Sequence, residues 1–153
     1  MAGDKPPDAP FRAALDALDA YPYPLLAAIN GHAFAGGALW ALAHDVRVMR
    51  ADRGWFCLPE VDIDKVFRPG MAALVRARLA PAVAFEAMTT GRRYGGGEAA
   101  ADRIVDAVAG AEELLATAIE LARGQAHRAL PVRAEIKRVA YAAELAALSA
   151  PQG

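Results

Sequence analysis

The feature that most limits how this chain can fold is a long uncharged stretch near its start. Residues 21–43 contain no Asp, Glu, Lys or Arg, so most of the stretch is expected to be buried. A membrane-spanning helix needs about 20 consecutive apolar residues. Helix-breaking and turn-forming residues interrupt the run here: Pro22, Pro24, Asn30, Gly31, Gly36 and Gly37. We therefore expect a buried strand at 25–29, a turn at 30–31 and a buried helix at 35–43, with no membrane span.

Strands and helices alternate along the rest of the chain. Apolar runs predict strands at 46–49, 55–57 and 104–108. Helical spacing or helix-start signals predict helices at 11–20, 69–79, 81–88, 98–101, 112–123 (ended by Gly124) and 131–148. Residues 58–68 are expected to form a loop. Continuous apolar strands between helices favour a parallel α/β layer.

The domain organisation is expected to be simple. We expect a disordered tail at 1–9, an α/β core at 10–110 and a helical segment of the same domain at 111–150. In the last helix one apolar face is formed by Val132, Ile136, Val139, Ala143 and Ala147. Lys137 lies off that face and is expected to be solvated.

Charge and cysteine content exclude several classes of function. The 153 residues include 17 Lys and Arg against 18 Asp and Glu, so no overall positive charge attracts nucleic acid. The one cysteine, Cys57, cannot form a disulfide within the chain and lies in a predicted buried strand. His32, His44 and His127 show no spacing typical of a metal site. We therefore expect no metal and no nucleic-acid partner.

The first candidate site is the start of the predicted helix at 35–43, where Gly36 and Gly37 stand. A helix start presents unpaired N–H groups and a partial positive charge, and glycine lets a ligand approach the backbone. Such a site can hold a phosphate, a carboxylate or a developing oxyanion. The alternative is that the two glycines only allow close packing of the helix on a strand.

The second candidate site is Glu60, which follows an apolar strand and Pro59. Ligands of open α/β sheets bind outside the carboxyl ends of the strands. A carboxyl group packed by Trp55, Phe56 and Leu58 would have a raised pKa, which suits a general acid or base. The alternative is an exposed glutamate in a loop.

Taken together, these segments resemble the crotonase superfamily, the enoyl-CoA hydratases and isomerases. The matching sequences are PLLAAINGHAFAGGALWALAHDVRVM, LPEVDI and TGRRYGGGEAAADRIVDAV. The tracts DRGWFCLPEVDI and PGMAALVRARL are most similar to the Δ3,Δ2-enoyl-CoA isomerase branch. The resemblance covers about four-fifths of the chain. It implies an incomplete crotonase-like (ClpP/crotonase) β-α spiral that lacks the N-terminal third of a family member.

The resemblance also implies roles for individual residues. Gly36 stands where the family has its second oxyanion-hole N–H, and Glu60 where the isomerase branch has its catalytic carboxylate. Hydratases carry another Glu at the position of Leu39, so isomerisation of a 3-enoyl-CoA by one carboxylate is the expected reaction. The other expected contacts with the substrate are His32, Ala33, Phe34, Ala35, Gly37, Leu58 and Pro59. Lys137 is a candidate for a CoA phosphate.

Other functions stay open at this point. The family's first oxyanion donor lies upstream of the matched region. The chain could therefore be a catalytically impaired, truncated homologue that binds acyl-CoA or serves as an oligomer subunit. Hydration is a weaker alternative, and His32 could be only a turn residue. Fatty acid metabolism is the expected setting, with CoA as part of the substrate and no separate cofactor.

Partners and location follow from the same features. The resemblance implies a homo-oligomer, a trimer in the family, and missing upstream strands would leave an open sheet edge. The first residues lack the apolar segment of a secretory signal, and the C-terminus PQG is not a peroxisomal SKL signal. We expect a cytoplasmic protein, with the peroxisome as the alternative.

Overall fold

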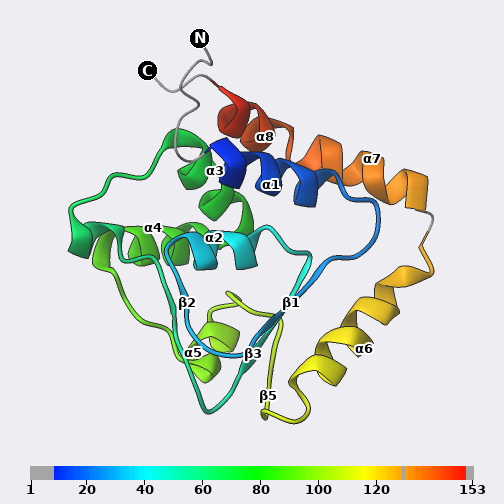
Figure 1. Ribbon diagram of the computed structural model, residues 1–153, viewed down its shortest axis with the longest axis horizontal. Helices are drawn as coiled ribbons and strands as arrows, with labels where there is room; N and C mark the ends of the chain where they lie inside the picture. Colours follow the sequence, from blue (N-terminus) through cyan, green and yellow to red (C-terminus); the bar gives the residue numbers. More distant parts are fainter. Residues whose placement is uncertain (1–8, 129, 151–153) are drawn as a thin grey trace.

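The computed structural model describes residues 9–128 and 130–150, and its centre is a parallel sheet (Figure 1). Strands β1 (Leu26–Ile29), β3 (Val46–Arg50) and β5 (Ala107–Ala109) lie in the order β1-β3-β5. Leu26 is paired with Val46, and Val48 with Ala107. All pairs are parallel, as the continuous apolar runs predicted.

A second, two-stranded sheet carries the residues of interest. Strands β2 (Ala33–Phe34) and β4 (Phe56–Cys57) pair in parallel, with Ala33 beside Phe56 and Phe34 beside Cys57. β2 was not predicted, because two residues are too few to show a periodicity. Phe56 also forms an antiparallel bridge with Tyr94, which extends this small sheet.

Helices cover both faces of the larger sheet. Their bounds are α1 Ala9–Ala20, α2 Gly36–Leu42, the 3-10 helix η1 Glu60–Ile63, α3 Pro69–Arg78, α4 Pro81–Thr90, α5 Gly96–Ala101, α6 Leu114–Ala126, α7 Leu130–Ala140 and α8 Ala142–Ser149. Val46 and Val48 pack against Leu114 and Ala118 of α6. Ile29, Met49 and the apolar sides of α1 to α5 and α8 form the main core on the other face. In Figure 1, α6 lies beside the larger sheet, and α1, α7 and α8 lie together at the top of the view.

Most predicted elements are present, and the differences are concentrated after residue 57. η1 lies inside the predicted loop 58–68, and the last strand starts at Ala107 rather than at 104. Gly124 lies inside α6, which ends at Ala126. The predicted helix 131–148 is two helices, because Tyr141 leaves helical geometry between α7 and α8. The predicted tail 1–9 falls almost entirely outside the described residues.

The orientation of α7 corrects the prediction made from its apolar face. Val132, Ile136 and Val139 are 58%, 61% and 62% exposed, whereas Lys137 is only 5% exposed. Lys137 Nζ lies 3.0 Å from Asp45 Oδ2 and 3.1 Å from the carbonyl oxygen of Tyr21. The buried carboxylate of Asp45, distant in sequence, therefore turns the lysine inward and the apolar stripe outward.

β1 is an edge strand in the described part of the chain. A cavity of about 370 Å³ runs along it, lined by residues 27–33 and by Gly37, Trp40, Ala41 and His44 of the neighbouring segment. None of the described helices is long and apolar enough to cross a membrane.

Candidate active site

Helix α2 begins directly at the carboxyl end of β2. The Ala35 N–H donates to the Cys57 carbonyl oxygen at 3.0 Å, continuing the pairing of β2 with β4. Ala35 then turns the chain with φ 47° and ψ −117°, a conformation that residues with a Cβ rarely adopt. The N–H groups of Gly36 and the next residues are consequently the free donors at the start of the helix.

The Ala35 conformation leads to a stability prediction. Replacing Ala35 by Gly is expected to raise the free energy of unfolding by about 1 kcal/mol, because glycine adopts this positive φ without steric strain. Urea denaturation followed by circular dichroism measures the change. Ala116→Gly, at an exposed position of α6, is the matched control and should lower the free energy of unfolding by about 1 kcal/mol. A loss of stability in Ala35→Gly would contradict the strain.

The two glycines are not required by packing. A Cβ added at Gly37 would meet no atom within 4 Å, and one at Gly36 would meet only the Phe11 ring, at 3.9 Å. A side chain would fit at either position, so close packing of helix on strand does not explain these glycines. What their lack of a side chain provides is open space beside the first N–H groups of α2.

Glu60 lies at the carboxyl end of the neighbouring strand. After β4 the chain passes through buried Leu58 and through Pro59, and Glu60 begins η1. Because β2 and β4 are parallel and in register, the segments that follow them leave the small sheet at the same end, where the carboxyl ends of both strands lie. The pairing of these two strands thus brings Glu60 and Gly36 to one side of the molecule.

The environment of Glu60 favours the neutral form of its carboxyl group. The side chain is half-buried, and Oε2 is buried with no hydrogen-bond partner among the described residues. Burial raises the pKa of Glu60 above that of an ordinary glutamate, and a hydrogen bond from its own backbone opposes this only in part. Glu60 is therefore not the exposed loop glutamate of the alternative interpretation. A carboxyl group with an unused oxygen and a raised pKa is suited to accept and return a proton.

η1 is positioned by α4, a contact that sequence reasoning missed. Asp62 packs so closely on Gly91 that a Cβ at Gly91 would lie 2.4 Å from Asp62 Oδ2. Gly91 also has φ 63°, and its carbonyl oxygen accepts a hydrogen bond from buried Cys57 Sγ at 3.2 Å. The segment that follows Glu60 therefore packs on Gly91, the left-handed residue that ends α4.

The structure distributes the other predicted site residues over three places. Ala35, Gly37, Leu58 and Pro59 adjoin the carboxyl ends of β2 and β4, and Phe34 lies within β2. His32 precedes β2 and stacks on Trp55, with ring centroids 5.1 Å apart, so it lies toward the amino end of the strand. His32, Ala33 and Gly37 also line the cavity along β1. Leu39 is buried and supplies no second polar group.

Lys137 does not join this site. Its Nζ is directed at Asp45 Oδ2 and at the carbonyl oxygens of Tyr21 and Leu18, the last at 3.4 Å. These three acceptors account for the three N–H donors of a lysine. The expectation that Lys137 serves a CoA phosphate is therefore corrected, because the ammonium group is buried and already paired. Within residues 9–128 and 130–150, no group of three or more His, Cys, Asp or Glu could hold a metal ion.

Comparison with models of known protein families identifies the family of the chain. The family model described as enoyl-CoA hydratase/isomerase matches residues 2–149. The chain belongs to this family. Curated relatives include enoyl-CoA delta isomerase 3 of Arabidopsis thaliana, 42% identical over 100 residues, which are 65% of this chain and 42% of that protein. Carnitinyl-CoA dehydratase of Proteus mirabilis is 39% identical over 116 residues, 76% of this chain and 44% of that protein.

Solved structures of the family have the same fold. A probable enoyl-CoA hydratase from Mycobacterium tuberculosis matches with a TM-score of 0.83 and 26% identity, over 90% of this chain and 58% of that one. An enoyl-CoA hydratase/carnithine racemase from Magnetospirillum magneticum matches with a TM-score of 0.74 and 33% identity, over 88% of this chain and 49% of that one. The crotonase-like α/β fold of the chain follows from these matches. The chain spans about half the length of the curated relatives that it matches.

Proposed function

We propose that this chain is an enoyl-CoA isomerase that shifts the double bond of a 3-enoyl-CoA to the 2-position. The observation that carries the proposal is the half-buried Glu60 carboxyl group, whose Oε2 has no partner among the described residues, at the same sheet edge as Gly36. The 42% sequence identity between the chain and enoyl-CoA delta isomerase 3 supports the proposal further. Fatty acid β-oxidation is the proposed metabolic setting, with CoA as part of the substrate.

The proposed reaction needs one base and one oxyanion donor. The Glu60 carboxylate removes a proton from C2 of the substrate, and the electron pair of that C–H bond delocalises through the double bond and the thioester carbonyl. The Gly36 N–H donates a hydrogen bond to the thioester oxygen, which carries the negative charge of the dienolate. Protonated Glu60 then returns the proton to C4, and the double bond ends between C2 and C3. No redox partner or metal takes part in these steps.

The residue at position 39 favours isomerisation over hydration. Addition of water requires that a water molecule be held and activated as well as a proton delivered. In the family resemblance a second carboxylate does this at the position of Leu39, which is buried and apolar here. Hydration therefore remains the weaker alternative.

The assay that tests the proposal measures both reactions on the same protein. Purified chain is incubated with trans-3-hexenoyl-CoA, and the conjugated 2-enoyl thioester is followed by its ultraviolet absorbance. Hydration is followed as loss of that absorbance from trans-2-hexenoyl-CoA. Isomerisation above the uncatalysed rate, with slower or no hydration, is the expected result. Faster hydration than isomerisation would contradict the proposal.

A second candidate function is binding of acyl-CoA without turnover, or service as a subunit of a larger assembly. It is favoured by the open edge of β1 among the described strands, because an unpaired strand edge can bind a partner chain. Calorimetric titration with hexanoyl-CoA separates the two functions. Saturable binding without conversion of 3-hexenoyl-CoA would support this second candidate and contradict the first.

The pH dependence of the isomerase reaction follows from the raised pKa of Glu60. The base must be ionised to remove the C2 proton, so activity is expected to fall as the pH drops through this pKa. Burial of the carboxyl group raises the pKa above 4.5, so the acidic limb of kcat/KM should lie above pH 4.5. Initial rates between pH 4 and 9 measure it. A limb at or below pH 4.5 would contradict the assignment.

Self-association and location complete the proposal. We also propose a homo-oligomer, a trimer by resemblance, in which the exposed side chain of Val139 on α7 is covered. Sedimentation of the wild type and of Val139→Ser tests this: the variant should shift toward monomer. The proposed location is the cytoplasm, although two relatives, both from Arabidopsis thaliana, are named as peroxisomal enzymes.

A further inference from the structure

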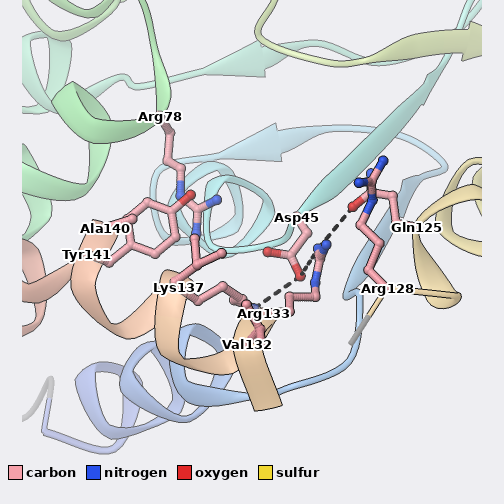
Figure 2. A pocket seen from close by; sticks show the side chains of 10 residues that line it. Asp45, Arg78, Gln125, Arg128, Val132, Arg133, Lys137, Ala140 and Tyr141 are labelled. Carbon is pink, nitrogen blue, oxygen red and sulfur yellow. Dashed lines mark hydrogen bonds and ion pairs between the residues drawn. The ribbon is translucent and has the colours of Figure 1, made fainter. Parts of the chain in front are cut away.

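A second cavity, remote in sequence from Glu60 and Gly36, lies where α6, α7, the end of α3 and the start of β3 meet. It has a volume of about 480 Å³, within the roughly 300–1,000 Å³ usual for small-molecule sites. Its lining combines Asp45, Gln125 and Tyr141 with four basic side chains and an apolar strip of α7. Figure 2 shows Asp45 between Lys137 and Tyr141 on one side and Gln125 and Arg128 on the other.

The charges buried beside this cavity do not balance. Asp45 Oδ2 lies 3.0 Å from Lys137 Nζ and 3.5 Å from Arg133 Nη2, and it accepts the backbone N–H of Leu25. The side chains of Asp45, Lys137 and Arg133 are 8%, 6% and 17% exposed. One carboxylate thus faces two cations with little solvent. Buried charge without a counter-charge is costly, so this cluster favours an additional anion.

Arg128 and Arg133 leave donors for such an anion. Arg133 Nη2 donates to Gln125 Oε1 at 2.9 Å, but its Nε is buried without a hydrogen-bond partner among the described residues. Arg128 follows α6 and is exposed, and its guanidinium makes no hydrogen bond or ion pair with the described side chains. Arg78, by contrast, is already held: its guanidinium lies 3.9 Å above the Tyr141 ring, and Nη2 donates to the Ala43 carbonyl oxygen at 3.4 Å. Guanidinium groups arranged around a cavity match the geometry of carboxylate and phosphate oxygens.

The remaining wall of the cavity is apolar. Val132, Ile136 and Ala140 follow one another at helical spacing along α7 and line it. We propose that this cavity binds a small amphipathic anion, of the class of a medium-chain carboxylate. Its charged group lies at Arg128 and Arg133, and its alkyl chain lies along α7. This site is separate from the proposed catalytic site and does not depend on the isomerase reaction.

Calorimetric titration of the full chain with three probes tests the ligand chemistry. Sodium octanoate carries both parts of the proposed ligand, inorganic phosphate only the charge and 1-octanol only the chain. Octanoate is expected to bind saturably at one site, at least about tenfold more tightly than phosphate, because burial of two or three methylenes suffices for that factor. Absence of saturable octanoate binding, or equal binding of octanol, would overturn the proposal.

Variants test the place of binding. Arg128→Gln should weaken octanoate binding about tenfold, the effect of one charge-assisted hydrogen bond, and Arg133→Gln at least as much. Arg128 lies on the surface and its replacement leaves the buried cluster intact, so the result does not depend on a folding defect. Arg53→Gln removes the same charge outside the cavity lining and should leave the affinity unchanged, as should Glu60→Gln. Unchanged affinity in Arg128→Gln, or an equal loss in Arg53→Gln, would overturn the proposed site.

Discussion

Replacement of Glu60 by glutamine is expected to lower kcat for isomerisation of 3-hexenoyl-CoA by about 10²–10⁴-fold, the usual contribution of a general acid or base. Glutamine has nearly the same shape as glutamate but cannot take up and return a proton. The proposed contacts with the thioester come from Gly36 and its neighbours rather than from Glu60, so KM should change little. Steady-state kinetics with purified wild type and variant measure both constants.

Two controls separate loss of chemistry from loss of structure. Asp64→Asn changes an exposed carboxylate of the same loop, at φ 51°, a conformation that Asn tolerates well, and should keep a rate near that of wild type. Because the pKa of Glu60 is raised, the folded state binds its proton more tightly than the unfolded chain. Ionised Glu60 therefore costs stability as the pH rises through the two pKa values. Glu60→Gln should consequently be at least as stable as wild type at pH 7.

Replacement of Lys137 by methionine is expected to lower the free energy of unfolding by about 1–3 kcal/mol, the usual cost of leaving a buried polar group without a partner, because Arg133 remains 3.5 Å from Asp45. The ammonium group joins Asp45 of the α2–β3 junction to the backbone at the end of α1, at Leu18 and Tyr21. Its loss removes the closer of the two cations from the buried Asp45 carboxylate and a donor from the Tyr21 carbonyl oxygen. Most domains are stable by only about 5–15 kcal/mol, so the change should be large. Urea denaturation measures it.

The matched control for Lys137 is an exposed lysine. Lys65→Met removes the same group from the loop after η1, where the side chain is exposed, and should change the free energy of unfolding by less than about 0.5 kcal/mol. Equal stability losses in the two variants would contradict the structural role of the Lys137–Asp45 pair. A loss in Lys137→Met below about 1 kcal/mol would contradict it as well.

The parts of the fold that local sequence determines were predictable. β1, β3, α3 and α4 follow from continuous apolar runs and from prolines at helix starts, and all four lie close to their expected positions. No glycine or proline in the sequence predicts the break between α7 and α8 at Tyr141. The burial of Lys137 depends on Asp45, which contacts it across 92 positions in sequence. Patterns read within one helix predicted Val132 inside and Lys137 outside, and this long-range ion pair reverses both.

The sequence suggested residues for the candidate site but not how they are arranged. Family resemblance assigned Glu60 and Gly36, and the alternation of strands indicated the sheet ends near which they lie. Their adjacency depends on the pairing of β2 with β4, two strands of two residues each, which no periodicity reveals. The packing of Asp62 on Gly91 could not be predicted either, because it joins two segments that are distant in the sequence.

Exchange of substrate hydrogen with solvent tests most directly whether Glu60 transfers protons at the thioester site. In D₂O, saturated hexanoyl-CoA cannot isomerise, but a base and an oxyanion donor suffice to replace its C2 hydrogens with deuterium. Mass spectrometry of the recovered thioester should detect deuterium with the wild-type chain and with Asp64→Asn, and only the uncatalysed level with Glu60→Gln. Equal exchange in wild type and Glu60→Gln, or none above background in wild type, would contradict the account.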